Sequence, residues 1–132
     1  MPGMNSRHLL LLAAALLASP AWAATPAEQL AAFGAAAGSA PSAERGRTLF
    51  NTPHGRDWSC ATCHGARPVG TGRHASTQRD IAPLAPAANA ARFTDTAKTE
   101  KWFRRNCNDV LGRECTAGEK ADVLAWLLTL KP

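Results

Sequence analysis

The segment Ser59–Gly65 reads SCATCHG and places two cysteines and a histidine at a defined spacing. Cys60, Cys63 and His64 form C-x-x-C-H, the attachment pattern of c-type haem, in which both thiols become thioethers and the imidazole binds iron. Zinc is disfavoured because adjacent Cys63 and His64 would struggle to share one tetrahedral centre. A redox-active dithiol of the C-x-x-C kind belongs in a βαβ context, which this chain does not indicate. The segment therefore predicts one covalently bound haem c.

The N-terminus has the features of an export signal. Arg7 precedes a short apolar run over residues 9–18, and Ala21-Trp22-Ala23 fits a small-x-small cleavage site. The run is shorter than the roughly 20 apolar residues that span a bilayer, so an uncleaved membrane anchor is the weaker alternative. We therefore expect residues 1–23 to be a cleaved signal peptide and residues 24–132 to form one monohaem cytochrome c domain in the periplasm.

Haem iron has a second axial position, and the composition limits what can fill it. The chain's two methionines, Met1 and Met4, both lie in the predicted signal peptide, and the chain has no tyrosine. The thioether ligand of many electron-transfer cytochromes would therefore be missing from the mature protein. The candidates opposite His64 are an open position, a lysine, His54, His74, Asn89, Asn106 and Asn108.

Four stretches carry helix signals, which predicts an all-α domain. Capping boxes at residues 25–28 and 116–119 begin the first and last helices. The predicted helices span residues 25–38, 42–50, 94–110 and 116–130, and the third is capped by Thr94 or Asp95. No stretch alternates strictly enough to predict a strand. Residues 65–89 are rich in Gly, Pro and polar residues and predict a long loop, which covering a haem edge would explain.

The third predicted helix carries an apolar face that includes one amide. Residues 99, 102, 103, 106, 107 and 110 recur at three- and four-residue steps, so Trp102, Phe103 and Asn106 should face the haem together. Asn108 should point away. An amide oxygen is a donor that ferric iron accepts, although an asparagine near a helix end more often bonds to backbone. His54 and His74 lie in polar, glycine-containing stretches that favour exposed loops.

The second pair of cysteines, Cys107 and Cys115, closes a short loop. If the protein is exported, the oxidising compartment favours a disulfide between them. Free buried thiols or a metal site are the alternatives. The net charge is +5, with basic residues scattered along the chain. No run of basic residues is long enough to form an arm that binds nucleic acid. At most, the positive charge could steer the protein toward acidic redox partners.

Beyond these patterns, the region after the predicted signal peptide resembles the sphaeroides haem protein family of oxygen-binding class I cytochromes c. The likeness includes TPAEQL, AERGRTLF, CATCHG, IAPLAP and the stretch from RFTDTAKTEKWF to ADVLAWL, and it covers nearly the whole mature domain. RNCN followed by GREC is its most distinctive part. The resemblance implies a class I cytochrome c domain of about four helices around one haem. It also implies His64 as proximal ligand, Asn106 as distal ligand and a Cys107–Cys115 disulfide.

In that family the asparagine leaves on reduction and opens the iron to oxygen or nitric oxide. Relatives occur with a dihaem cytochrome c and a membrane cytochrome b, which the resemblance implies as electron donors. The resulting hypothesis is a redox-gated protein that binds oxygen, nitric oxide or carbon monoxide. The alternatives are a plain electron carrier, with a histidine or lysine opposite His64, and a small oxidase, peroxidase or nitrogen-oxide reductase. The last is weakest because no motif supplies a distal acid–base residue.

Overall fold

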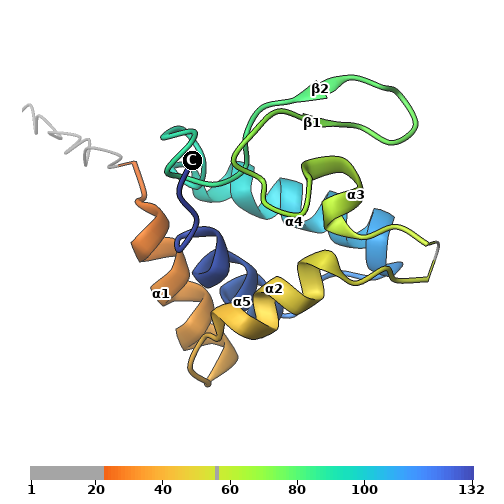
Figure 1. Ribbon diagram of the computed structural model, residues 1–132. Helices are drawn as coiled ribbons and strands as arrows, with labels where there is room; N and C mark the ends of the chain where they lie inside the picture. Colours follow the sequence, from red (N-terminus) through yellow and green to blue (C-terminus); the bar gives the residue numbers. More distant parts are fainter. Residues whose placement is uncertain (1–22, 56) are drawn as a thin grey trace, which may run out of the picture.

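The computed structural model describes residues 23–55 and 57–132, so the predicted signal peptide lies almost wholly outside the described residues. The described chain is mostly helical, as predicted, with two very short strands (Figure 1). None of its helices is long and apolar enough to cross a membrane. In chain order the elements are α1 (Pro26–Ala37), α2 (Ala43–Asn51), α3 (Cys60–His64), β1 (Gly72–Arg73), β2 (Asp80–Ile81), α4 (Thr96–Leu111) and α5 (Ala117–Leu127).

Side-chain caps fix where the longer helices begin. Thr25 and Thr116 each accept a hydrogen bond from the backbone N–H of the glutamate three residues later, and each glutamate bonds back, which confirms both predicted capping boxes. Of the two caps proposed for α4, Asp95 performs the role: its carboxylate accepts from the Lys98 N–H at 2.9 Å. These bonds satisfy backbone donors that a helix leaves open at its start.

The structure corrects two expectations about secondary structure. A fifth helix, α3, contains the C-x-x-C-H segment itself, and it is too short for hydrophobic periodicity to reveal. The predicted loop over residues 65–89 contains the antiparallel pair β1–β2, in which Gly72 pairs with Ile81 and Arg73 with Asp80. Two-residue strands cannot display alternation, so their pairing is invisible in the sequence.

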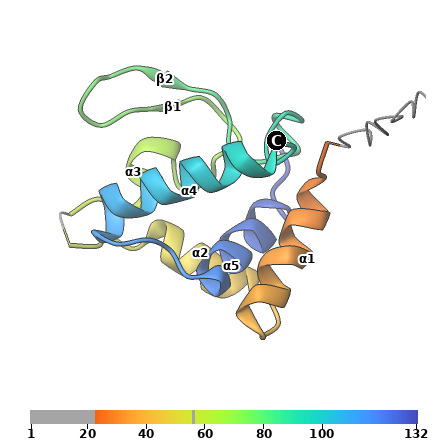
Figure 2. The same cartoon turned by 180° about the vertical axis from the view of Figure 1, so that it is seen from behind.

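Helix α5 forms the centre of the core, with α1 and α2 packed against it (Figures 1 and 2). Leu124 and Leu127 are fully buried, and the Trp126 ring lies 5.0 Å from that of Phe50 on α2. Gly46 allows α2 to approach this closely, because a side-chain carbon there would collide with the Asp122 carbonyl. A base of three packed helices therefore supports the remaining elements.

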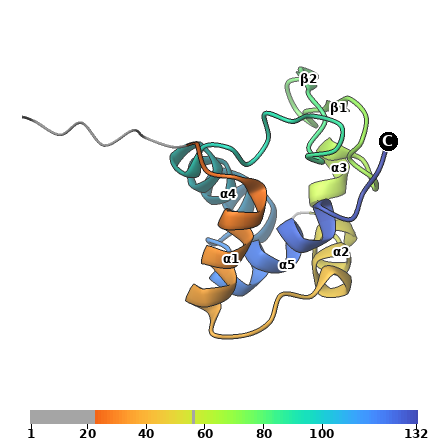
Figure 3. The same ribbon diagram turned by 90° about the vertical axis from the view of Figure 1, so that its left-hand side faces the viewer.

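The other elements lie on one end of this base. Figure 3 shows α3 and α4 on different sides of the domain, with the segment between residues 65 and 95 passing from one to the other. β1 lies directly against α3, since a side-chain carbon at Gly72 would collide with the Cys63 carbonyl. The connecting segment thus links α3 to α4.

Candidate haem site

Helix α3 holds the three residues of the C-x-x-C-H pattern on one short turn. Ser59 caps the helix and forms a capping box with Thr62, and Gly65 ends it with a φ of +81°, which favours glycine. Cys60 and Cys63 lie three residues apart and are therefore neighbours on one helical face. Both are free thiols and both are partly buried. This arrangement is suited to two thioether links to one porphyrin.

His64, the last residue of α3, is held in a form that binds metal. Its ring centroid lies 6.1 Å from that of Phe50. Burial, with a smaller contribution from the nearby Arg92 cation, lowers the pKa of His64 to about 4. The imidazole is therefore neutral at physiological pH and has a nitrogen lone pair free for a metal.

The two thiols differ in environment. Burial raises the pKa of Cys60 to about 11, so its unlinked thiol stays protonated. The Sγ of Cys63 accepts a hydrogen bond from the Ala75 N–H at 3.3 Å, which connects it to the turn after β1. The β1–β2 segment therefore contacts α3 both at the Cys63 carbonyl and at its sulfur.

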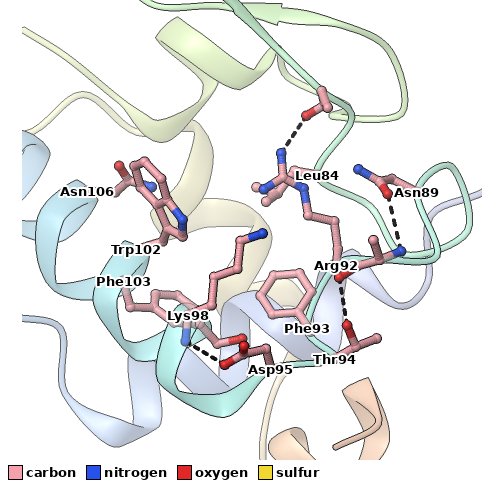
Figure 4. A pocket seen from close by; sticks show the side chains of 13 residues that line it. Leu84, Asn89, Arg92, Phe93, Thr94, Asp95, Lys98, Trp102, Phe103 and Asn106 are labelled. Atoms are coloured by element: carbon pink, nitrogen blue, oxygen red, sulfur yellow. Dashed lines mark hydrogen bonds between the residues drawn. The ribbon is translucent and has the colours of Figure 1, made fainter. Parts of the chain in front are cut away.

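A cavity of about 490 Å³ lies between α4 and the segment that precedes it. This volume is in the range of pockets that hold cofactors. Figure 4 shows α4 side chains on one side of the cavity and those of residues 84–93 on the other. Apolar and polar groups are both present in its wall: Ala82, Leu84, Asn89, Ala91, Arg92, Phe93, Thr94, Asp95, Lys98, Thr99, Trp102, Phe103 and Asn106.

Asn106 and Asn108 have different surroundings. Asn106 lines the cavity together with Trp102 and Phe103, as the helical face predicts. Its amide is half-buried and forms no hydrogen bond within residues 23–55 and 57–132. The Asn108 side chain is exposed and donates to the Arg104 carbonyl at 2.8 Å. Asn106 is therefore the amide of this pair that is available to a ligand in the cavity.

The other predicted candidates are engaged elsewhere or only partly free. His54 Nε2 lies 3.1 Å from the Leu49 carbonyl, and His74 Nδ1 accepts from the Thr77 N–H at 3.2 Å; neither histidine lines the cavity. Asn89 does line it, but its amide donates to the Pro83 carbonyl and accepts from the Ala91 N–H.

Two charged residues of the cavity wall were not singled out by number from the sequence. Arg92 is half-buried, and its guanidinium donates to the Ala82 and Pro83 carbonyls at 2.7 and 2.9 Å. Lys98 extends into the cavity from the first turn of α4 (Figure 4). The helical period that selected Trp102 and Asn106 also places Lys98 on their face, so that signal was present for Lys98. No local pattern identifies Arg92.

The residue that follows Asn106 forms a disulfide. Cys107, buried on α4, is bonded to Cys115, with the two Cα atoms 5.6 Å apart, which confirms the predicted bridge. The bond joins the last turn of α4 to the residue before the α5 cap. The backbone beside Asn106 is therefore tied to the helical base.

The donor set fits a covalently attached haem. Two free thiols share a helical turn with a neutral imidazole. None of the three lines the cavity, but Arg92, whose charge acts on His64, does, as does Asn106, whose amide has no hydrogen bond within the described residues. Among the described residues no three His, Cys, Asp or Glu side chains form a group that could hold a metal ion. Cys60 and Cys63 would hold the porphyrin and His64 its iron.

A mostly helical domain with C-x-x-C-H on a short helix, beside a cavity of mixed apolar and polar lining, is a class I cytochrome c. A family model described as a domain of unknown function, DUF1924, matches residues 36–127. The cytochrome c-type protein SHP of Cereibacter sphaeroides is 51% identical over 128 residues, covering 89% of this chain and 95% of that protein. The chain belongs to this SHP family of cytochromes c.

Other relatives agree on the fold. Cytochrome c'' of Methylophilus methylotrophus is 45% identical over 94 residues, 68% of this chain and 65% of that protein. The structure of oxidised SHP, described as an oxygen-binding cytochrome c, superimposes with a TM-score of 0.76 at 52% identity, covering 82% of this chain and 99% of that one. Oxidised cytochrome c'' gives a TM-score of 0.73 at 37% identity, covering 81% and 95%.

Proposed function

We propose that this protein is a periplasmic monohaem cytochrome c that binds small diatomic ligands when reduced. Its relative SHP is described as oxygen-binding, and a solution structure of cytochrome c'' addresses haem-ligand detachment. The haem would supply one-electron chemistry and an iron site for oxygen, nitric oxide or carbon monoxide. The protein's own residues would decide when that site is open.

The observation that carries the proposal is the position of Asn106. It is the cavity amide without a hydrogen bond to the described chain, and it lies one helical turn beyond Trp102. In the oxidised protein its side-chain oxygen, a hard donor, suits Fe(III). The softer Fe(II) of a reduced haem would gain less from that oxygen, so the Asn106 side chain would be free to move away from it. Reduction by one electron would thereby bias a two-state equilibrium of the Asn106 side chain.

Side chains around Asn106 suit the vacated position to neutral molecules. Trp102, Phe103 and Leu84 supply apolar surface in the cavity wall. A small uncharged diatomic ligand loses little hydration on moving into such surroundings, whereas an anion loses a great deal. The apolar part of the wall is therefore suited to oxygen, nitric oxide and carbon monoxide, while Arg92 and Lys98 add positive charge to the same cavity.

The competing function is that of a plain electron carrier, and the position of Lys98 favours it. Lys98 lines the same cavity as Asn106, so an uncharged lysine could bind iron in its place. Such a carrier would stay six-coordinate in both oxidation states and would not take up gases readily. A dihaem cytochrome c and a membrane cytochrome b are the proposed electron donors in either case.

The test is rapid mixing of the dithionite-reduced holoprotein with carbon monoxide, followed by absorption. We expect fast formation of the complex in one step whose rate rises linearly with carbon monoxide concentration. A slow rate that saturates with carbon monoxide would show that a protein ligand must first leave the ferrous iron, and would contradict the proposal.

Three matched variants identify the group concerned. Asn106→Ala should alter the ferric spectrum and leave the rapid ferrous reaction intact, because its side chain has already withdrawn. Asn108→Ala is the matched amide control and should change neither. Lys98→Ala should leave the ferric spectrum unchanged; if it alone alters that spectrum, the electron-carrier function takes the place of ligand binding.

A further inference from the structure

Helix α4 carries an exposed aromatic side chain between two cations. Trp102 is the exposed large hydrophobic residue of the described chain, and its 39% exposed surface is shared between the outside of α4 and the cavity that it lines. Lys101 Nζ lies 5.7 Å from the centroid of its ring, and the Arg105 guanidinium carbon lies 5.5 Å away. Both distances are within cation–π range. We name these three residues, Lys101, Trp102 and Arg105, the α4 patch.

The two cations of the α4 patch form no ion pairs within the described residues. By contrast, neighbouring Arg104 pairs with Glu114 at 3.2 Å, and Glu100 pairs with Lys120 at 2.6 Å. Glu100 and Glu114 are thus already engaged. The exposed carboxylate of Asp109, four residues after Arg105 on α4, offsets one of the two positive charges. The patch therefore presents net positive charge to solvent.

Trp102 also connects this surface to the candidate haem site. The same ring that is part-exposed on α4 lines the cavity beside Asn106 (Figure 4). A molecule docked on the exposed part of Trp102 would therefore be separated from the cavity by this one side chain. Aromatic and arginine side chains are also those most enriched at protein interfaces.

We propose that the α4 patch is the docking surface for an acidic electron-donor protein; this inference rests on the proposed haem site. Charge complementarity fixes the kind of partner, because two unpaired cations around an aromatic centre attract a surface rich in carboxylates. One electron passes from the reduced donor to this protein. The donor is oxidised by one electron, this protein is reduced by one, and no bond forms or breaks.

The experiment measures how fast the oxidised holoprotein is reduced by two donors in stopped flow or after a laser flash. The first is reduced plant-type ferredoxin, an acidic one-electron protein, and the second is the neutral lumiflavin semiquinone, which needs no charged docking surface. The test variant is Lys101→Glu/Arg105→Glu. The control is Lys131→Glu, next to the C-terminus, which lies on the other side of the domain from α4 in Figure 3.

At low ionic strength the α4 double variant should react with ferredoxin about tenfold or more slowly than the unmodified protein, the control less than about twofold. The difference should shrink in about 0.5 M salt, where the screening length is only a few ångströms. Lumiflavin semiquinone should reduce all three proteins at equal rates. Lys101→Ala/Arg105→Ala, which removes charge without reversing it, should show the same order with a smaller effect.

The double variant changes the charge by four units and Lys131→Glu by two. If the control is slowed by about the square root of the factor measured for the double variant, only net charge matters and the inference is overturned. Equal slowing by both donors would also overturn it, since the substitutions would then have changed the haem site and not docking. Carbon monoxide binding by the dithionite-reduced protein is measured in parallel. If the unmodified protein binds carbon monoxide but the patch has no effect, docking fails while the proposed function stands.

Discussion

Loss of the Cys107–Cys115 disulfide should destabilise the protein and loosen Asn106. The bond closes a loop with a sequence separation of eight residues. The chain-entropy relation for a loop this short gives a loss of about 2.5 kcal/mol in the free energy of unfolding. For a domain of roughly 110 residues this corresponds to a fall in melting temperature of about 10 °C.

The variant that tests this is Cys115→Ala, because it keeps the buried Cys107 side chain in the core. Guanidinium unfolding of the oxidised holoprotein, followed through haem absorption, gives the free energy of unfolding. Ferric binding of imidazole is measured beside it and should strengthen, since Asn106 would compete less well once its helix end is no longer tied. Adding a thiol reductant to the variant should have no further effect on its stability and serves as the control.

A loss of less than about 1 kcal/mol would refute the reasoning on stability, because the entropy of so short a loop cannot be that small unless the unbridged chain stays ordered. A loss of the expected size with unchanged imidazole binding would refute the coupling to Asn106. In that case the end of α4 would be held by its packing against the core alone.

Three further predictions concern other parts of the structure. Cys60→Ala or Cys63→Ala should weaken or abolish covalent attachment, read as haem that extracts into acidified organic solvent; complete extraction from the unmodified protein would contradict the attachment. Gly72→Ala should cost about 1–3 kcal/mol in guanidinium unfolding, because its new methyl group meets the Cys63 backbone; an unchanged midpoint would contradict that close contact. The Arg113 hydrogen bond lowers the pKa of Glu119 to about 2, so its contribution is full above its ordinary value of 4.5 and is lost as pH falls toward 2. Glu119→Gln should therefore cost about 1–2 kcal/mol near neutral pH and flatten the acid limb of the stability profile; parallel profiles would exclude this ion pair.

Local signals predicted the helices well. The Thr25 and Thr116 caps act within three residues, so each is complete in a short stretch of sequence. The third predicted helix, residues 94–110, differs from α4 mainly in its cap, because Asp95 and Thr94 are both good caps and only the backbone decides between them. Helix α3 and the β1–β2 pair were missed since each is too short to show a period.

The cavity was predictable on one side only. Trp102, Phe103 and Asn106 share a helix, so periodicity alone brings them together. The opposite wall depends on long-range contacts: the Gln29 amide on α1 donates to the Phe93 carbonyl at 2.8 Å, across 64 residues. Phe93 itself has a φ of +58°, a left-handed conformation that no local pattern predicts for a phenylalanine. The positions of Arg92 and Phe93 are therefore set by packing.

The release of Asn106 on reduction is the central claim, and resonance Raman spectroscopy of the holoprotein in both oxidation states tests it most directly. The bands that report spin and coordination are compared between the unmodified protein and Asn106→Ala. We predict a six-coordinate ferric iron that changes in the variant, and a five-coordinate high-spin ferrous iron that is the same in both proteins. A six-coordinate low-spin ferrous spectrum in the unmodified protein, or identical ferric spectra in the two, would contradict the claim.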